Sequence, residues 1–457
     1  MIDRVWRRLA SPVVLALAAA APALAIGLSE ERELGARFAL EARRRLPLLR
    51  EPALTGYLQR VGQRIVTHLD GQLFAYRFFL VRESSLNAFA VPGGYVYVHT
   101  GLLTRVTSEA ELAGVLAHEI VHVHAHHVLR QQEQTALVNY ATLLGLFLSA
   151  VHPALGAGAA SAGAAVQLKY LRQFEQEADH VGLELMRAAG FDPSGMPSFL
   201  RLVLREQQLN PTGVPPYFLS HPLTEDRVGE LERRARDMAR PAPRPGGEAE
   251  LAAAQVTVRA LIEPRDSVLP AYQERLARSP DSALGQHLLG LVYLYTGQPE
   301  RAEPLLERAA SGESPRARGD HGRALARLGK VAEARAEFEA HLRESSDDPA
   351  ITLELARTLL AAGDLKAAAA HLESALTGDP ELDDAEYTLA ECRGKSGDAR
   401  AQWWHLGRAF ALRGDFERAL TAYEKARELS PKDTPEREEA DTTIAEIARA
   451  GLTESRR

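Results

Sequence analysis

Five consecutive residues carry the groups that could perform chemistry in this chain, namely His118, Glu119, Ile120, Val121 and His122. On a helix, residues four apart lie on one face, so the imidazoles of His118 and His122 could bind one metal ion. Glu119 follows the first of these ligands, and its carboxylate would lie beside the ion. A carboxylate in that place can accept a proton from water, as metal-assisted hydrolysis requires.

This interpretation needs a helix, and the flanking residues predict one over 108–127. Ser108 and Glu111 form a capping-box pattern at its start. Apolar residues then recur at helical spacing, and they are Leu112, Val115, Leu116, Ile120 and Val123. The motif is typical of zinc peptidases, although a His-rich surface helix is an alternative on these residues alone.

A second segment, YLRQFEQEADH at 170–180, could complete the metal site. On a helix Glu175 and Asp179 share a face, whereas Glu177 points elsewhere. A zinc site with two histidines requires a third protein ligand, and we assign Glu175 to this role. Asp179, one turn later, could accept the N–H of a ligating histidine and so orient it. The alternative is a solvated acidic helix.

A β-hairpin is predicted just before the metal-binding helix. Residues 76–81 have the β-branched and aromatic content of a strand, and 87–98 combine an extended segment, a Pro-Gly-Gly turn and a second strand. An edge strand beside a metal can hold a peptide substrate by main-chain pairing. We assign Asn87, Ala88 and Phe89 to such a strand, with a plain structural hairpin as the alternative.

The order NAFAVPGGYVYVHTGLL, HEIVH and EQEAD resembles the exported zinc metallopeptidases related to the CAAX prenyl proteases, in particular those that also carry tetratricopeptide repeats. The resemblance implies a zincin-like α+β domain with a small β-sheet and one Zn²⁺ per chain. It carries the motif over onto Asn87, Phe89, Pro92, Gly93, Gly94, His118, Glu119, His122, Glu175 and Asp179.

The same resemblance extends to Ser220-His221-Pro222 and to Arg227. It implies that a His-Pro loop and an arginine lie over the metal, where Arg227 could stabilise the oxyanion of the reaction. A neutral imidazole is a good fourth zinc ligand, so His221 could latch the site shut. The alternatives are that His221 assists the transition state, or that it is an ordinary loop histidine.

The N-terminus has the pattern of an export signal. Three arginines precede an apolar run at 13–21, and Ala23-Leu24-Ala25 follows as a cleavage signal. We therefore expect a signal peptide at 1–25 and a periplasmic protein, with association of the mature form with a membrane left open and an uncleaved anchor as the alternative. The net charge of −7 does not favour nucleic acid. The single cysteine, Cys392, excludes an internal disulfide.

The chain of 457 residues is longer than one core usually serves, so at least two domains are expected. A Pro/Gly linker at 240–250 is the predicted boundary between a metallopeptidase domain at 26–239 and a repeat domain at 251–457. Glycines recur there at Gly297, Gly329, Gly363 and Gly414, each followed five residues later by alanine. This spacing is typical of tetratricopeptide repeats, so we predict a mainly α protein that ends in an α-helical solenoid.

The segment 134–168 contains no Lys, Arg, Asp or Glu. Both ligand segments flank it and must lie on one side of any membrane, and two spans would need about 40 residues. We therefore expect a flap over the site, a peripheral contact with a membrane or partner, or a buried helix pair.

Together these features predict an exported zinc endopeptidase of the cell envelope whose repeats recruit protein clients. The resemblance implies that the clients are outer-membrane β-barrel proteins or their assembly machinery, and that misassembled proteins are cleaved and could also be chaperoned. The alternative function is a chaperone or scaffold with a latched, weakly active protease domain.

Overall fold

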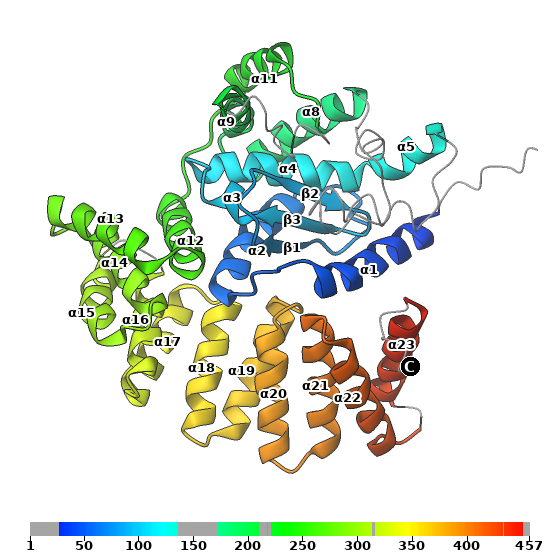
Figure 1. The fold of residues 1–457 in the computed structure, drawn as a ribbon, viewed down its shortest axis with the longest axis vertical. Coiled ribbons are helices and arrows are strands. Elements are labelled where there is room, and N and C mark those ends of the chain that lie inside the picture. Colours follow the sequence, from blue (N-terminus) through cyan, green and yellow to red (C-terminus); the bar gives the residue numbers. More distant parts are fainter. Residues whose placement is uncertain are drawn as a thin grey trace, which may run out of the picture.

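The computed structural model describes residues 27–135, 172–209, 217, 221–312, 316–432 and 434–450. An α+β domain with a small sheet lies against an arc of helical repeats (Figure 1). The predicted fold class, mainly α with a small sheet followed by a solenoid, is confirmed. The predicted signal peptide at 1–25 and residues 136–168 of the uncharged segment lie outside the described residues.

A three-stranded sheet with the order β1-β3-β2 lies within the N-terminal domain. Strand β1 (Arg77–Val81) pairs in parallel with β3 (Tyr95–His99), and β2 (Ala88–Val91) pairs with β3 in antiparallel fashion. The predicted hairpin is therefore confirmed. Its turn contains Gly93 and Gly94 at φ 85° and 94°, a conformation that other residues rarely adopt. In this sheet β2 is an edge strand.

Helix α4 (Glu109–His124) carries the two histidines and is buried along most of its length. It begins where predicted, because the Ser108 hydroxyl accepts a hydrogen bond from the Glu111 N–H at 3.2 Å. The elements packed around it are β2, α2 (Pro52–Val66), α8 (Arg172–Ala188) and α9 (Gly195–Leu209). The alternative of a His-rich surface helix is therefore wrong.

Glycines allow α4 and α9 to approach closely. A Cβ on Gly114 would lie 2.7 Å from Met196 Cα, and one on Gly195 would lie 2.3 Å from the carbonyl carbon of Ala110. Larger residues would push the two helices apart. Further helices described in this domain are α1 (Leu28–Arg45), α3 (Thr100–Leu103), α5 (His127–Thr135) and α11 (Glu225–Asp237).

The C-terminal part consists of successive helices that pack side by side (Figure 1). Gly297, Gly329 and Gly363 lie in turns between helices at φ 75° to 85°, and the alanine five residues after each is fully buried. The predicted tetratricopeptide spacing thus marks the turns and the crossings of the helices. Their bounds are α12 (Gly247–Ile262), α13 (Arg265–Arg278), α14 (Ala283–Tyr295), α15 (Pro299–Ala310), α16 (Ala317–Arg327), α17 (Val331–Glu344), α18 (Pro349–Ala361), α19 (Leu365–Gly378), α20 (Asp383–Lys395), α21 (Ala399–Arg413), α22 (Phe416–Leu429) and α23 (Pro435–Arg449).

Helix α12 packs on both parts of the protein. Leu251, Ala254 and Val258 belong to the core of the N-terminal domain. Ala253 and Val256, on another face, pack into the first repeat helices. The boundary at 240–250 stays a prediction, and this packing shows that the helix after it is shared between the two cores.

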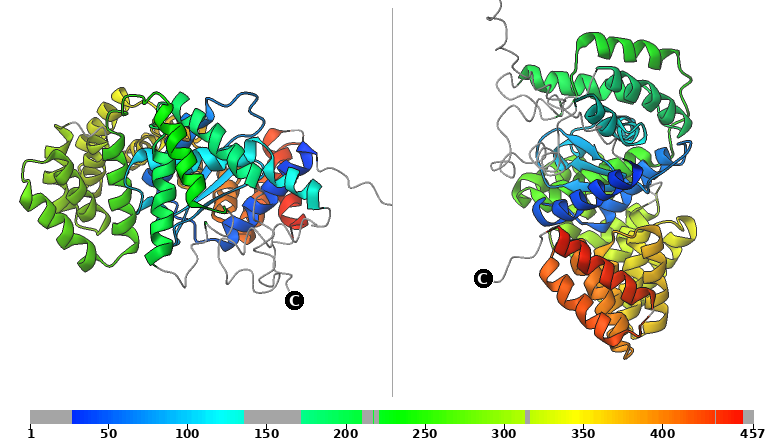
Figure 2. Two further views of the ribbon diagram at one scale, coloured as in Figure 1. Left: turned by 90° about the horizontal axis from the view of Figure 1, so that it is seen from above. Right: turned by 90° about the vertical axis from the view of Figure 1, so that its right-hand side faces the viewer.

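Partly buried ion pairs add to the contact between the two parts. Arg323 of α16 lies 2.8 Å from Glu51, and Arg43 of α1 lies 2.6 Å from Glu381. Figure 2 shows α1 lying along the last repeat helices, in agreement with its contacts with α21. Within the described part of the chain, no helix combines the length and the apolar character needed to cross a membrane.

Candidate metal centre

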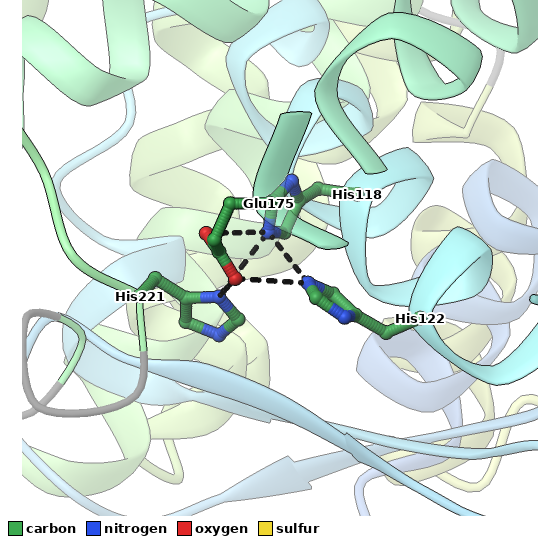
Figure 3. Close-up of side chains that lie close together, drawn as sticks. All are labelled: His118, His122, Glu175 and His221. Carbon is green, nitrogen blue, oxygen red and sulfur yellow. Dashed lines mark hydrogen bonds and ion pairs between the residues drawn. The ribbon is translucent and has the colours of Figure 1, made fainter. Parts of the chain in front are cut away.

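The three predicted ligands converge on one buried point (Figure 3). Nε2 of His118 and Nε2 of His122 lie 3.0 Å apart, as their spacing on one face of α4 predicts. Glu175 reaches them from α8, with carboxylate oxygens 3.6 Å from His118 Nε2 and 3.4 Å from His122 Nε2. The packing of α8 on α4 thus brings together residues that are far apart in the sequence.

His221 joins this cluster as a fourth side chain. Its Nδ1 lies 3.2 Å from His118 Nε2 and 3.0 Å from a carboxylate oxygen of Glu175. The ring of Tyr217 stacks on it with centroids 4.6 Å apart. The His-Pro loop therefore lies at the cluster, as the resemblance implies, while the role of His221 as a latch stays a prediction.

The chemistry of the cluster suits a divalent metal ion. His118, His122, Glu175 and His221 offer ligand atoms that all lie within 4.8 Å of one another. Burial lowers the pKa of His122 well below its usual range, which favours the neutral imidazole that binds metals. Burial would raise the pKa of Glu175, but the neighbouring histidines outweigh it and hold that pKa well below its usual range. Neutral imidazoles with a carboxylate are a donor set that zinc prefers.

Glu119 lies beside the cluster as the motif predicts. Its carboxylate is buried, and one oxygen, Oε1, has no hydrogen-bond partner among the described residues. The same oxygen lies 3.4 Å from His221 Nε2. Burial raises the pKa of Glu119, although His221 and His118 oppose this effect. The backbone of Ala90 in β2 forms a hydrogen bond with this carboxylate, so the edge strand and the acid–base group are neighbours.

Asp179 lies where a residue that orients His118 should lie. Its Oδ1 is 3.0 Å from His118 Nδ1, the ring nitrogen that faces away from the cluster. Arg227 holds the other side of this carboxylate with two hydrogen bonds of 2.7 and 2.8 Å. Burial would raise the pKa of Asp179, but Arg227 outweighs it and lowers that pKa. Asp179 is therefore an ionised acceptor for the His118 N–H.

Arg227 has more partners than the sequence predicts. Besides Asp179, its Nη1 donates to the carbonyl oxygen of Pro222 at 3.0 Å and lies 2.7 Å from Glu175 Oε2. The arginine thus ties α8 to the His-Pro loop. Its assignment to the oxyanion stays a prediction.

Two residues near His122 were not assigned a role from the sequence. His127 places its Nδ1 2.8 Å from Nδ1 of His122, and its Nε2 lies 3.3 Å from Glu177. Spacing alone gave no signal for this contact, because α4 ends at His124 and the chain changes direction before His127. Glu177 was expected to point away from the metal, and among the described residues it contacts the cluster through His127.

The predicted substrate strand lies at the site. Ala88 and Phe89 belong to β2 and pair with β3, and Asn87 directly precedes them. All three are buried among the described residues, and Asn87 Oδ1 has no hydrogen-bond partner there. Their role in holding a substrate stays a prediction.

Comparisons with known proteins agree with this geometry. Residues 52–235 match peptidase family M48, and residues 287–349, 320–383 and 401–433 match tetratricopeptide-repeat families. The beta-barrel assembly-enhancing protease of Escherichia coli is 33% identical over 221 residues, which cover 47% of this chain and 45% of that protein. The mitochondrial metalloendopeptidase OMA1 of Schizosaccharomyces pombe is 30% identical over 179 residues, which cover 39% of this chain and 52% of that protein.

The chain spans about half the length of the curated relatives it matches. Among solved structures, the tetratricopeptide-repeat protein YrrB is 18% identical with a TM-score of 0.31, over 38% of this chain and 92% of that one. The predicted resemblance is confirmed at the level of a metallopeptidase domain joined to repeats. Residues 52–235 are thus a domain of peptidase family M48, and tetratricopeptide repeats follow it in the chain.

Proposed function

We propose that this protein is a zinc-dependent endopeptidase. The observation that carries the proposal is the buried cluster of His118, His122 and Glu175 with Glu119 beside it, inside a domain of a metallopeptidase family. Zinc held by the first three residues would supply a Lewis acid that polarises the peptide carbonyl and favours the ionisation of water.

The protein groups around this point have separate tasks. Glu119 would accept the proton of the attacking water and return it to the leaving nitrogen. Asp179, held by Arg227, would keep the His118 ring in place. The outer edge of β2, the edge strand of the sheet, would pair with the main chain of the substrate next to Glu119.

The test uses the full-length protein and four matched samples. Wild type, Glu119→Gln, Glu175→Ala and Glu184→Ala are compared for zinc content and for digestion of unfolded casein. Glu184 lies on the exposed side of α8 and serves as the control. We expect Glu119→Gln to retain zinc and lose proteolysis, Glu175→Ala to lose zinc, and the control to match wild type. Casein digestion by Glu119→Gln at the wild-type rate would refute the proposal.

We further propose that the protein acts in the periplasm on outer-membrane β-barrel proteins or their assembly machinery. The support is the export pattern at 1–25, the repeats and the name of the matched Escherichia coli relative. Wild type should cleave a purified, unfolded outer-membrane β-barrel protein faster than casein, and Glu119→Gln should retain it uncleaved. Equal rates on both substrates would contradict this client class. Protection of the β-barrel protein from aggregation without cleavage would favour a chaperone instead.

A further inference from the structure

The two ligand histidines of α4 differ in what supports them. His118 and His122 both direct Nε2 into the cluster, so their Nδ1 atoms face away from it. Nδ1 of His118 meets the carboxylate of Asp179 directly. Nδ1 of His122 lies 2.8 Å from a ring nitrogen, Nδ1 of His127.

The position of the proton on each of these two rings follows from the role of its nitrogen atoms. A neutral imidazole that offers Nε2 to a metal carries its proton on Nδ1. His122 therefore donates from Nδ1, and Nδ1 of His127 accepts. The remaining proton of a neutral His127 then lies on Nε2, which faces a carboxylate oxygen of Glu177 at 3.3 Å. This tautomer places an N–H of His127 on the side of Glu177, at ion-pair distance from its carboxylate.

Glu177 has a second, charged neighbour. Arg130 of α5 lies 2.9 Å from its carboxylate. Glu177 also stands on α8 between Glu175 and Asp179. One helix therefore provides the carboxylate ligand, the direct support of His118 and the carboxylate that faces His127.

The position of the His127 ring is also fixed by packing and by the backbone. The ring is fully buried and stacks on Phe174 with centroids 4.7 Å apart at 15°. His126, just before it, has φ 53°, the single positive φ of a non-glycine residue in the described chain. Its ring bonds to the buried carboxylate of Glu31 at 2.7 Å. This strained turn lies between α4 and α5 and places His127 next to Nδ1 of His122.

We propose that His127 and Glu177 are positioning residues that hold His122 in the orientation and tautomer needed to bind the metal. This inference rests on the proposed metal centre. It gives a task to the glutamate between Glu175 and Asp179 and to the histidine that follows the end of α4. Supports of this kind typically change metal affinity by about 10- to 100-fold when they are removed.

The test measures the dissociation constant for Zn²⁺ alone, by competition with a coloured chelator, on full-length protein stripped of metal. His127→Phe keeps the ring stacked on Phe174 but removes the acceptor, whereas His127→Asn keeps an acceptor near Nδ1 and removes the ring. We expect the Phe variant to bind Zn²⁺ about 10- to 100-fold more weakly. The Asn variant should lie closer to wild type than to the Phe variant.

Glu177→Ala and Glu177→Gln form a second pair, with Glu184→Ala as the control on the exposed face of α8. Loss of the carboxylate in Glu177→Ala should weaken Zn²⁺ binding, and Glu177→Gln should restore part of it because its amide oxygen still accepts. This pair decides the matter if His127→Phe does not fold, as judged by the thermal unfolding of the metal-free protein.

Wild-type affinity in His127→Phe or in Glu177→Ala would overturn the proposal. An Asn variant that binds Zn²⁺ more weakly than the Phe variant would also overturn it, since packing of the ring on Phe174 would then explain the effect. A wild-type protein that binds no Zn²⁺ at this cluster would refute the metal centre itself, which is a different outcome.

Discussion

Truncating the chain before or after α12 should have very different consequences. One truncated protein, 26–249, follows the boundary predicted from the sequence and lacks all but the first three residues of α12. The other, 26–263, keeps it. Both lack all later repeats, so both lose the ion pairs of Glu51 and Arg43 with the repeat helices. The comparison therefore isolates the contribution of α12 to the N-terminal core.

The magnitude follows from the burial of two side chains. Leu251 and Val258 are 3% and 0% exposed in the N-terminal core. Full burial of such a side chain contributes about 1.5–3 kcal/mol, so their removal costs about 3–6 kcal/mol. That is a large part of the free energy of unfolding of a typical protein, which is about 5–15 kcal/mol. A domain of this size loses about 2–4 °C in its midpoint of thermal unfolding per kcal/mol, so the midpoint of 26–249 should lie about 6–24 °C below that of 26–263.

The assay is thermal unfolding followed by circular dichroism. Within 26–263, Leu251→Ala should cost about 2–5 kcal/mol, as expected for a buried leucine. Val256→Ala is the matched control, because its neighbours on the repeat side are absent from the truncated protein. Equal midpoints for 26–249 and 26–263 would refute the assignment of α12 to the N-terminal core.

Two further changes test single side chains. Burial raises the pKa of Asp379 to about 6. Between about pH 4 and 6 the unfolded chain has lost a proton that the folded protein keeps, so the free energy of unfolding should fall as the pH rises through this range. Asp379→Asn should remove this fall and raise the free energy of unfolding by about 2–3 kcal/mol at pH 7.5, as measured with denaturant. The control Asp281→Asn, at an exposed position, should do neither. His221→Ala should raise peptide turnover at fixed zinc if His221 is a latch; a fall of about 10- to 1000-fold would instead assign it to the transition state.

The sequence was sufficient to predict local features, whose signals are the spacing of a few residues or the residue type at a cap or turn. The i, i+4 spacing of His118 and His122 needs only a helix, and Ser108 marks where that helix begins. The Pro-Gly-Gly turn predicted the hairpin for the same reason, because the conformations of Gly93 and Gly94 are open to few other residues. The repeat glycines likewise report turns. Each of these signals lies within a few residues of the feature that it predicts.

What the sequence could not provide depends on tertiary packing. Glu177 was expected to point away from the metal, and that holds for its own helix, but α5 brings His127 to meet it. Arg227 was expected over the metal, and its contacts with Asp179 and Pro222 depend on how α11 packs beside α8. Proline and glycine at 240–250 suggest a linker, but they carry no information about which core the next helix joins.

The central claim is that His118, His122 and Glu175 hold one zinc ion. Anomalous diffraction from crystals of zinc-loaded, full-length protein, recorded on both sides of the zinc absorption edge, tests it directly. The account predicts a single strong anomalous peak between the two Nε2 atoms and the Glu175 carboxylate, and its loss in Glu175→Ala. Zinc bound elsewhere, or a peak that persists unchanged in Glu175→Ala, would contradict the account.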